Sequence, residues 1–314
     1  MRRVIGHRLL TFAPLILAVS LVVFVMINLM PGDPARYLAG DNSDPQRIEE
    51  IRRELHLDRS LPVQYKDWLT SAVTGDFGTS LIYKAPVLDL VRPRAAVTAW
   101  LALYAFAFAI VTATLLATTA ASRPGGLLDR ALAGACALGL SIPGFWLGMI
   151  LVLWLAIKHS IFPAIGYKGI GQGLWPWASH LILPAVALGI ALAAELTLQL
   201  RNSLGEVLAS DYILSARAKG VTHWAVLFRH ALKNAAVPVV TVLGTRFGQL
   251  IAGAVTVETV FALPGLGQLS VQSTSGRDIP VLLAMVILTT LAVAVANLVT
   301  DVATAYLNPR LSHP

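Results

Sequence analysis

The sequence is poor in charge, in cysteine and in the motifs that mark soluble enzymes. Only 13% of its 314 residues are Asp, Glu, Lys or Arg, whereas a soluble domain normally carries about 25%. The single cysteine, Cys136, excludes a secreted scaffold held by disulfides. Apolar residues make up 56% of the chain and the mean hydropathy is +0.70, so a soluble globule of this size would expose large apolar patches. These shortages exclude an ordinary soluble enzyme and a disordered chain, and they leave a polytopic membrane protein.

Sites for nucleotides, metals and hydrolysis are also missing from the sequence. It contains no G-x-x-x-x-G-K-[ST] phosphate loop, no H-E-x-x-H and no G-x-S-x-G. The seven histidines are scattered, and His223 with His230 is too small a group for a metal site. Ser141 lacks the second glycine of an intramembrane serine protease, so we expect it to satisfy a carbonyl freed by Pro143. The chain is therefore expected not to be an enzyme and to bind no metal or cofactor itself.

Six apolar segments are long enough to cross a bilayer core of about 30 Å, which takes roughly 20 helical residues. Backbone groups in hydrocarbon must be satisfied within the segment, and period-two alternation is absent, so the spans are expected to be helices. The first span is expected to be retained, because its apolar run is about twice that of a signal peptide and no A-x-A-like site follows. We predict transmembrane helices over residues 9–30, 97–122, 131–157, 179–200, 235–261 and 279–307.

The basic residues predict the orientation of these spans. Lys and Arg gather in the short segments that would lie on one side, and short basic loops stay in the cytoplasm. The cytoplasmic segments are then 1–8, 123–130, 201–234 and 308–314, with both termini inside, and the outer segments are 31–96, 158–178 and 262–278. The net charge of +7 is a sign of topology and not of nucleic-acid binding.

The outer segment 31–96 is expected to form a small helical domain. Asp44-Pro45, followed by Ile48, Ile51 and Leu55, suggests an amphipathic helix capped by Ser43 or Asp44. A second helix is predicted over Val63–Val73, followed by a turn over Gly75–Ser80. The fold class is an all-α membrane protein with six spanning helices and this extracytoplasmic domain.

Ionisable residues within the spans are candidates for function, because charge at membrane depth is costly. Glu195, Glu258 and Asp301 are placed near span ends, where capping or snorkelling explains them. Arg246 lies midway along the fifth span, where lining a pathway and forming an internal salt bridge are equal alternatives. The candidate pathway residues are Arg246, Glu258, Ser141 and Pro143.

Several small or helix-breaking residues are possible weak points of the spans. The alternative for each is ordinary close packing. They are Pro143, Gly144, Gly148, Pro184 and Gly189.

The cytoplasmic segment after the fourth span carries the richest local pattern. Ser203 with Glu206 forms a capping box, which predicts that a helix restarts there. Gly220 is suited to a left-handed helix stop, and Thr222 can begin a second short helix. The apolar residues of that helix fall at helical spacing, at Val221, Trp224, Ala225, Phe228 and Leu232. Periodicity alone does not separate a helix lying on anionic headgroups from one that docks into a groove on a cytoplasmic partner.

This segment resembles the coupling loop of ABC importer permeases, whose general pattern is E-A-A, three residues, Gly, nine residues, I-x-L-P. Gly220 is the glycine; Leu214-Ser215-Ala216 and His230-Ala231-Leu232-Lys233 stand for the flanking parts, in the variant form of the peptide-importer branch. Further matches follow in the same order along nearly the whole chain. They are Met30-Pro31-Gly32-Asp33-Pro34, Gly75-Asp76-Phe77-Gly78-Thr79-Ser80, Ser141–Gly148, Val257–Phe261, Pro264-Gly265-Leu266-Gly267 and Asn308-Pro309-Arg310. The chain thus resembles the first permease of dipeptide and oligopeptide importers.

The resemblance implies one half of a translocation pathway in the plasma (inner) membrane. The partners would be a second homologous permease, two cytoplasmic ATPase subunits that hold ATP and Mg, an extracytoplasmic solute-binding protein and lipid. The ATPase-coupling residues would be Asp211, Ala216, Arg217, Ala218, Lys219, Gly220, Trp224, Phe228, Arg229 and His230, with Gly220 setting the angle between two coupling helices. The alternative is an ion-coupled secondary transporter or channel, against which the lack of an acidic residue at the midplane counts.

Overall fold

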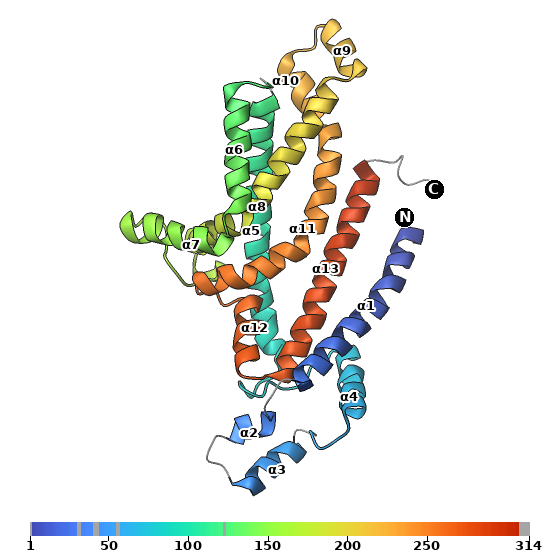
Figure 1. The fold of residues 1–314 in the computed structure, drawn as a ribbon, viewed down its shortest axis with the longest axis vertical. Coiled ribbons are helices and arrows are strands. Elements are labelled where there is room, and N and C mark those ends of the chain that lie inside the picture. The colour runs from blue at the N-terminus through green and yellow to red at the C-terminus, as the bar shows by residue number, and fades with distance from the viewer. Residues whose placement is uncertain (1, 30–32, 40–43, 55–56, 122–123, 308–314) are drawn as a thin grey trace. The chain divides into compact units, whose positions relative to one another are not determined.

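The computed structural model describes residues 2–29, 33–39, 44–54, 57–121 and 124–307. Helices are its only regular elements, and the one β-bridge in these ranges joins Thr79 to Pro86 (Figure 1). The all-α prediction is confirmed. In chain order the elements are α1 (Arg2–Leu29), α2 (Pro34–Ala39), α3 (Pro45–Glu54), α4 (Leu61–Val73), α5 (Val87–Ala121), α6 (Leu127–Ser141), α7 (Gly144–Leu151), the π-helical η1 (Val152–Lys158), the 3₁₀-helical η2 (Ile170–Gln172), α8 (Leu174–Leu208), α9 (Asp211–Ala218), α10 (His223–Ala225), the π-helical η3 (Val226–Ala231), α11 (Leu232–Val260), α12 (Leu266–Ser275) and α13 (Ile279–Leu307).

Four helices are long and apolar enough to cross a membrane, namely Val87–Ala121, Leu174–Leu208, Val226–Val260 and Ile279–Thr304. A bent pair, Leu127–Ser141 with Gly144–Lys158, makes a fifth if it counts as one span. The first predicted span falls in α1, where Pro14–Met26 is a shorter apolar helix. The count of six spans therefore stays a prediction.

The third predicted span is not the continuous helix expected over residues 131–157. Its two halves are bent by 101° at residues 142–143. Proline disfavours a helical conformation at the residue before it, and Ile142 and Pro143 are both extended, with ψ of 123° and 133°. The helix begins again at Gly144, which lies so close to α8 that an added Cβ would be 2.8 Å from the Ala187 carbonyl oxygen. Pro143 and Gly144 thus mark a real break.

The predicted helix start at Ser203 is wrong, because α8 continues unbroken to Leu208. A capping serine needs an extended backbone, whereas Ser203 is a buried residue within the helix. No proline interrupts the chain between residues 201 and 208, so nothing stops α8 from extending two turns beyond the predicted end of the fourth span. The helical segment that follows, α9, begins after the extended Ser210.

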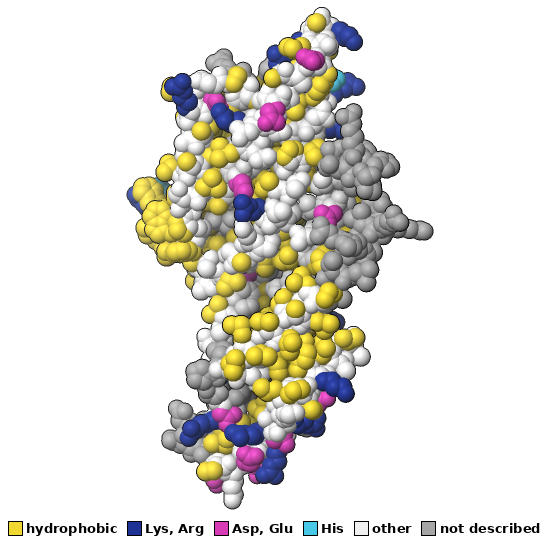
Figure 2. Space-filling model, turned by 45° about the vertical axis from the view of Figure 1, so that its right-hand side comes forward, with side chains coloured by type: hydrophobic (Ala, Val, Ile, Leu, Met, Phe, Trp, Pro, Cys, Tyr) yellow, Lys and Arg dark blue, Asp and Glu magenta, His cyan; other side chains and the backbone are white. Residues whose placement is uncertain are grey.

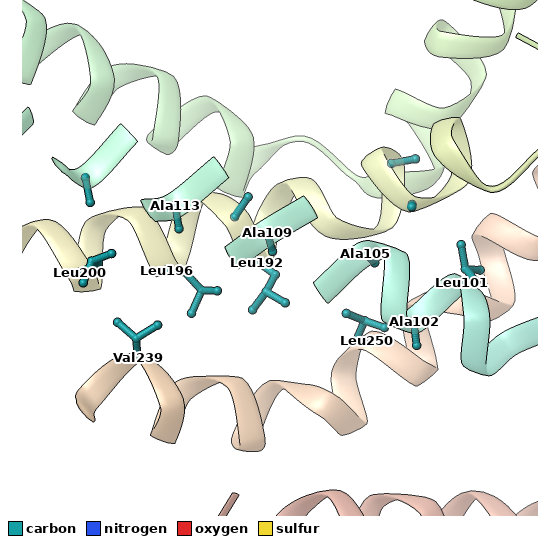
Figure 3. Close-up of a cluster of buried hydrophobic side chains, with 14 of the residues drawn as sticks. Leu101, Ala102, Ala105, Ala109, Ala113, Leu192, Leu196, Leu200, Val239 and Leu250 are labelled. Atoms are coloured by element: carbon teal, nitrogen blue, oxygen red, sulfur yellow. The ribbon is translucent and has the colours of Figure 1, made fainter. Parts of the chain in front are cut away.

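The chain forms two compact units, and the larger comprises residues 97–267 and 295–314. Within it, α8 packs against α6, α7 and α11. Small side chains bring α5 close to α8, since an added Cβ on Gly189 would lie 2.8 Å from the Ala105 carbonyl oxygen. Figure 3 shows the buried cluster at these helices. It includes Leu101, Ala105, Ala109 and Ala113 of α5, Leu192, Leu196 and Leu200 of α8, and Val239 and Leu250 of α11.

The other unit comprises residues 1–96 and 268–294. Its predicted helices are present as α3 and α4, and the Asp44 carboxylate accepts a hydrogen bond from the Gln46 amide, as expected of a cap. Ser43, the other candidate cap, lies outside the described residues. The turn after α4 is held by the buried Asp278, which accepts hydrogen bonds from the Ser80 hydroxyl and the Leu81 amide.

Candidate functional site

The predicted coupling segment folds as two helical pieces joined at Gly220. Gly220 has φ +79°, as predicted for a left-handed stop. Its amide donates to the Arg217 carbonyl at 2.9 Å, and the Val221 amide donates to the Ala216 carbonyl at 3.2 Å. This pair of bonds is the Schellman arrangement that closes a helix at glycine. The second piece begins after Thr222 as predicted, but it is not short, because α10 and η3 lead directly into α11.

Two aromatic side chains form an exposed apolar patch on this element. Trp224 and Phe228 stack with ring centroids 5.7 Å apart and 14° between the planes, and they are 67% and 49% exposed. Their neighbours Val226 and Leu227 are buried, so one side of the element packs inward while the aromatic side faces outward. Large exposed aromatic pairs are typical anchors at protein interfaces.

The remaining predicted coupling residues flank this pair in the sequence. Asp211, Arg217, Ala218, Lys219 and Arg229 are exposed, and Ala216 and His230 are partly buried. A hydrogen bond of 2.8 Å from the Asn234 amide nitrogen to the Tyr212 hydroxyl ties α9 to α11. The structure therefore brings these residues together on one element with a basic rim.

A second candidate site is a hollow of about 470 Å³ between α8 and α11, bordered also by residues at the α6–α7 break. Its polar wall is formed by Glu195, Arg246, Gln249 and Thr256. The rest of the wall is small or apolar, and consists of Leu140, Gly144, Ala187, Leu188, Ala191, Leu192, Leu250, Gly253 and Val257.

Arg246 forms the internal salt bridge that was one of its two predicted roles, and it also lines the hollow. Its Nε and Nη2 donate to Glu195 Oε1 at 3.0 and 2.5 Å, and Nη1 donates to Gln249 Oε1 at 2.6 Å. Glu195 lies thirteen residues before the end of α8, which continues past the predicted end of the fourth span; its place near a span end stays a prediction.

The other three candidate pathway residues are not part of the hollow's wall. Glu258 is fully buried and accepts a hydrogen bond of 2.6 Å from the Thr98 hydroxyl. Ser141 donates to the carbonyl of Ala137 and not to that of Gly139, four residues before Pro143, so its predicted role beside the proline is wrong. Pro143 shapes the break, while its neighbour Gly144 reaches the hollow.

Glu258 also explains two glycines of the Pro-Gly-Leu-Gly turn. An added Cβ on Gly265 would lie 2.3 Å from the Glu258 carboxylate, and one on Gly267 would lie 2.9 Å from Glu258 Oε2 and 2.5 Å from the Val255 backbone. The Thr98 hydroxyl in turn accepts a bond of 2.8 Å from the Leu266 amide. The buried acid therefore organises the turn after α11, which is a structural role.

Gln249 and Thr256 were not predicted as site residues. Gln249 is one helical turn after Arg246, and Thr256 is seven residues after Gln249, so both fall on the same helix face as the arginine. This helical spacing is the feature of the sequence from which Gln249 and Thr256 could have been predicted as neighbours of Arg246. Figure 2 shows charged side chains gathered at the top and at the bottom of the view, with few between them.

The sequence matches two family descriptions along its length. Residues 109–313 match "Binding-protein-dependent transport system inner membrane component", and residues 1–102 match the N-terminal part of such membrane components. A probable peptide ABC transporter permease of Sinorhizobium fredii is 39% identical over 307 residues, covering 98% of both chains. The glutathione transport system permease GsiC of Escherichia coli K12 is 38% identical over 306 residues, covering 98% of this chain and 97% of its own.

The fold is similar to a solved membrane transporter. An inward-facing structure of the MetNI methionine ABC transporter aligns with a TM-score of 0.53 at 20% identity, over 68% of this chain and 92% of that one. Together with the near-complete relatives, these matches show that the chain belongs to the family of multi-pass inner-membrane permeases of binding-protein-dependent transport systems.

Proposed function

We propose that this chain forms half of the translocation pathway of an ATP-driven importer for dipeptides or oligopeptides. The relatives named for peptide and glutathione transport support this cargo class. The other half of the pathway would come from a second, homologous permease. A solute-binding protein would deliver the cargo from outside, and two ATPase subunits would hold ATP and Mg, so that this chain has no catalytic role of its own.

The observation that carries the proposal is the exposed Trp224–Phe228 pair beside Gly220. An exposed aromatic pair with a basic rim is more stable when it is buried in a groove on an ATPase than when it is exposed to water. We propose that this element lies on the cytoplasmic side of the membrane and that both chain termini lie on the same side. The family membership disfavours the ion-coupled transporter or channel.

The docking role is tested with the complete transporter purified through a tag on this chain. Replacing both Trp224 and Phe228 with Ala removes the anchors, and we expect the retained ATPase to fall at least tenfold, because such anchors carry about 2 kcal/mol or more each and about 1.4 kcal/mol corresponds to a tenfold change in affinity. Trp175→Ala is the matched control, because Trp175 is equally exposed at 67% but lies in the first turn of α8. Wild-type retention in the double variant would contradict the docking role.

The angle between the helices is tested with Gly220→Val. An added Cβ at Gly220 meets no atom within 4 Å, so the substitution acts only through the left-handed backbone. The left-handed conformation costs valine about 1–2 kcal/mol. If the substituted residue leaves that conformation, the direction of α10 relative to α9 changes. We expect reduced uptake and altered cargo-stimulated ATP hydrolysis in reconstituted vesicles. If both rates equal those of the wild type, Gly220 does not transmit ATPase closure.

A further inference from the structure

The Glu195–Arg246 ion pair on the wall of the hollow has the chemistry of a binding site. We propose that it binds the charged ends of the cargo as it passes, with Arg246 taking a carboxylate and Glu195 an ammonium group. This inference rests on the proposed function, because it says which chemical feature of a peptide the pathway recognises.

The position of the pair favours contact with water and cargo. Arg246 is fourteen residues from each end of α11, which corresponds to about 21 Å of helix on either side. An ionised group at such depth must face the helix bundle or a wet cavity. The Arg246 and Glu195 side chains remain 38% and 28% exposed, and both line the hollow. The hollow is therefore the cavity that the pair faces.

The pair also retains unused hydrogen-bonding capacity. Both bonds from Arg246 reach the same oxygen, Glu195 Oε1, and within the described ranges nothing bonds to Oε2. A guanidinium group has five N–H donors, and three of them are used here, the third by Gln249. One carboxylate oxygen and two N–H groups remain to receive a ligand without breaking the salt bridge first.

A zwitterion matches this arrangement better than an ion of one sign. A planar guanidinium binds a carboxylate through two parallel bonds, while the free Glu195 oxygen can accept from an ammonium group. A ligand with a single charge would engage only one of these two sets of free groups and leave the other unused.

The size and wall of the hollow suit a small peptide. Its volume of about 470 Å³ falls within the range of about 300–1,000 Å³ that is usual for small-molecule sites. Such sites combine an apolar wall with a few fixed polar groups, as here. Ala187, Ala191 and Gly253 keep the wall open beside the ion pair, since none carries a side chain beyond Cβ.

The test uses the complete complex in proteoliposomes, with both permeases, the ATPases and the binding protein. Initial ATP-dependent uptake is compared for two peptides of one sequence, one with a free carboxylate and one with a C-terminal amide, chosen so that the binding protein binds both equally. Arg246→Gln should lower the acid-to-amide uptake ratio about tenfold, because charge-assisted hydrogen bonds to the carboxylate are lost. Glu195→Gln should lower the ratio of free-amine to N-acetyl peptide in the same way. Unchanged ratios would overturn the proposal.

Arg201→Gln is the matched control, because it breaks another ion pair of α8 that lies outside this hollow. It should slow both peptides equally, whereas a changed ratio would overturn the assignment to Arg246. If Arg246→Gln does not assemble, Arg246→Lys is used instead. Lysine keeps the positive charge beside Glu195 but lacks the planar guanidinium that binds a carboxylate through two bonds. The acid-to-amide uptake ratio should then still fall about threefold. A wild-type complex that takes up no peptide contradicts the proposed function, whereas normal uptake with unchanged ratios contradicts only this inference.

Discussion

Helix α8 carries two ion pairs that differ in how completely they are satisfied. Arg201 binds Asp129 through Nε and Nη2, one to each carboxylate oxygen, and the Gly125 amide adds a bond of 2.9 Å to Oδ2. Glu195 receives Arg246 on one oxygen only. The Asp129 side chain is 4% exposed, against 28% for Glu195. The first pair is closed and fixes α6 to α8, while the second remains open to a ligand.

The largest effect on stability is expected from Asp129→Asn. It leaves Arg201 without a charged partner and places an amide where two donors point, which should cost about 2–4 kcal/mol. Glu195→Gln should cost less than about 1 kcal/mol, because that pair is partly exposed. Thermal unfolding of the two purified variants measures the difference. Equal losses of stability in the two variants would show that the Asp129–Arg201 pair is not the better satisfied of the two.

Exchanging the two partners of each pair sharpens the comparison. Asp129→Arg with Arg201→Asp takes the acceptor away from the Gly125 amide, and we expect a loss of about 1–3 kcal/mol. Glu195→Arg with Arg246→Glu should remain within about 1 kcal/mol of the wild type, because the Gln249 amide can donate as well as accept. The same thermal measurement applies, and a stable exchanged Asp129–Arg201 pair would show that Gly125 does not set its polarity.

The smallest effect is expected at Gly125 itself. Its φ is +76° and an added Cβ meets no atom within 4 Å, so Gly125→Ala costs only the left-handed backbone, about 1 kcal/mol. Gly134→Ala is the control, because Gly134 has equally open space but lies within α6, where the backbone is helical; there alanine should stabilise slightly. A loss at both positions would mean that backbone conformation is not the cause at Gly125.

The sequence predicted the helices better than their ends. Charge-free runs predicted long apolar helices, and Gly220 predicted the left-handed turn between α9 and α10, because both signals are local. The end of α8 was misplaced since Ser203 and Glu206 have the same spacing within a helix as at its start. The bend at Ile142–Pro143 was only a possible weak point, because a proline does not by itself fix an angle of 101°.

The candidate sites were predictable only where their residues are neighbours in sequence. The coupling residues lie within one segment of twenty residues from Asp211 to His230. Glu195 and Arg246 are 51 positions apart, and nothing in a single sequence pairs them before α8 and α11 are packed together. Arg246 alone was recognised as unusual, because its cost at depth does not depend on its partner.

The bond between Thr98 and Glu258 has a consequence for the order in which the protein is made. Synthesis runs from the N-terminus, so α5 is complete long before the ribosome reaches the acid, 160 positions later. The Thr98 hydroxyl is therefore already present when Glu258 is translated, so the carboxyl group has this partner from the start. Because the hydroxyl precedes the acid in the chain, the group that is more costly to bury without a partner is the second of the two to be synthesised.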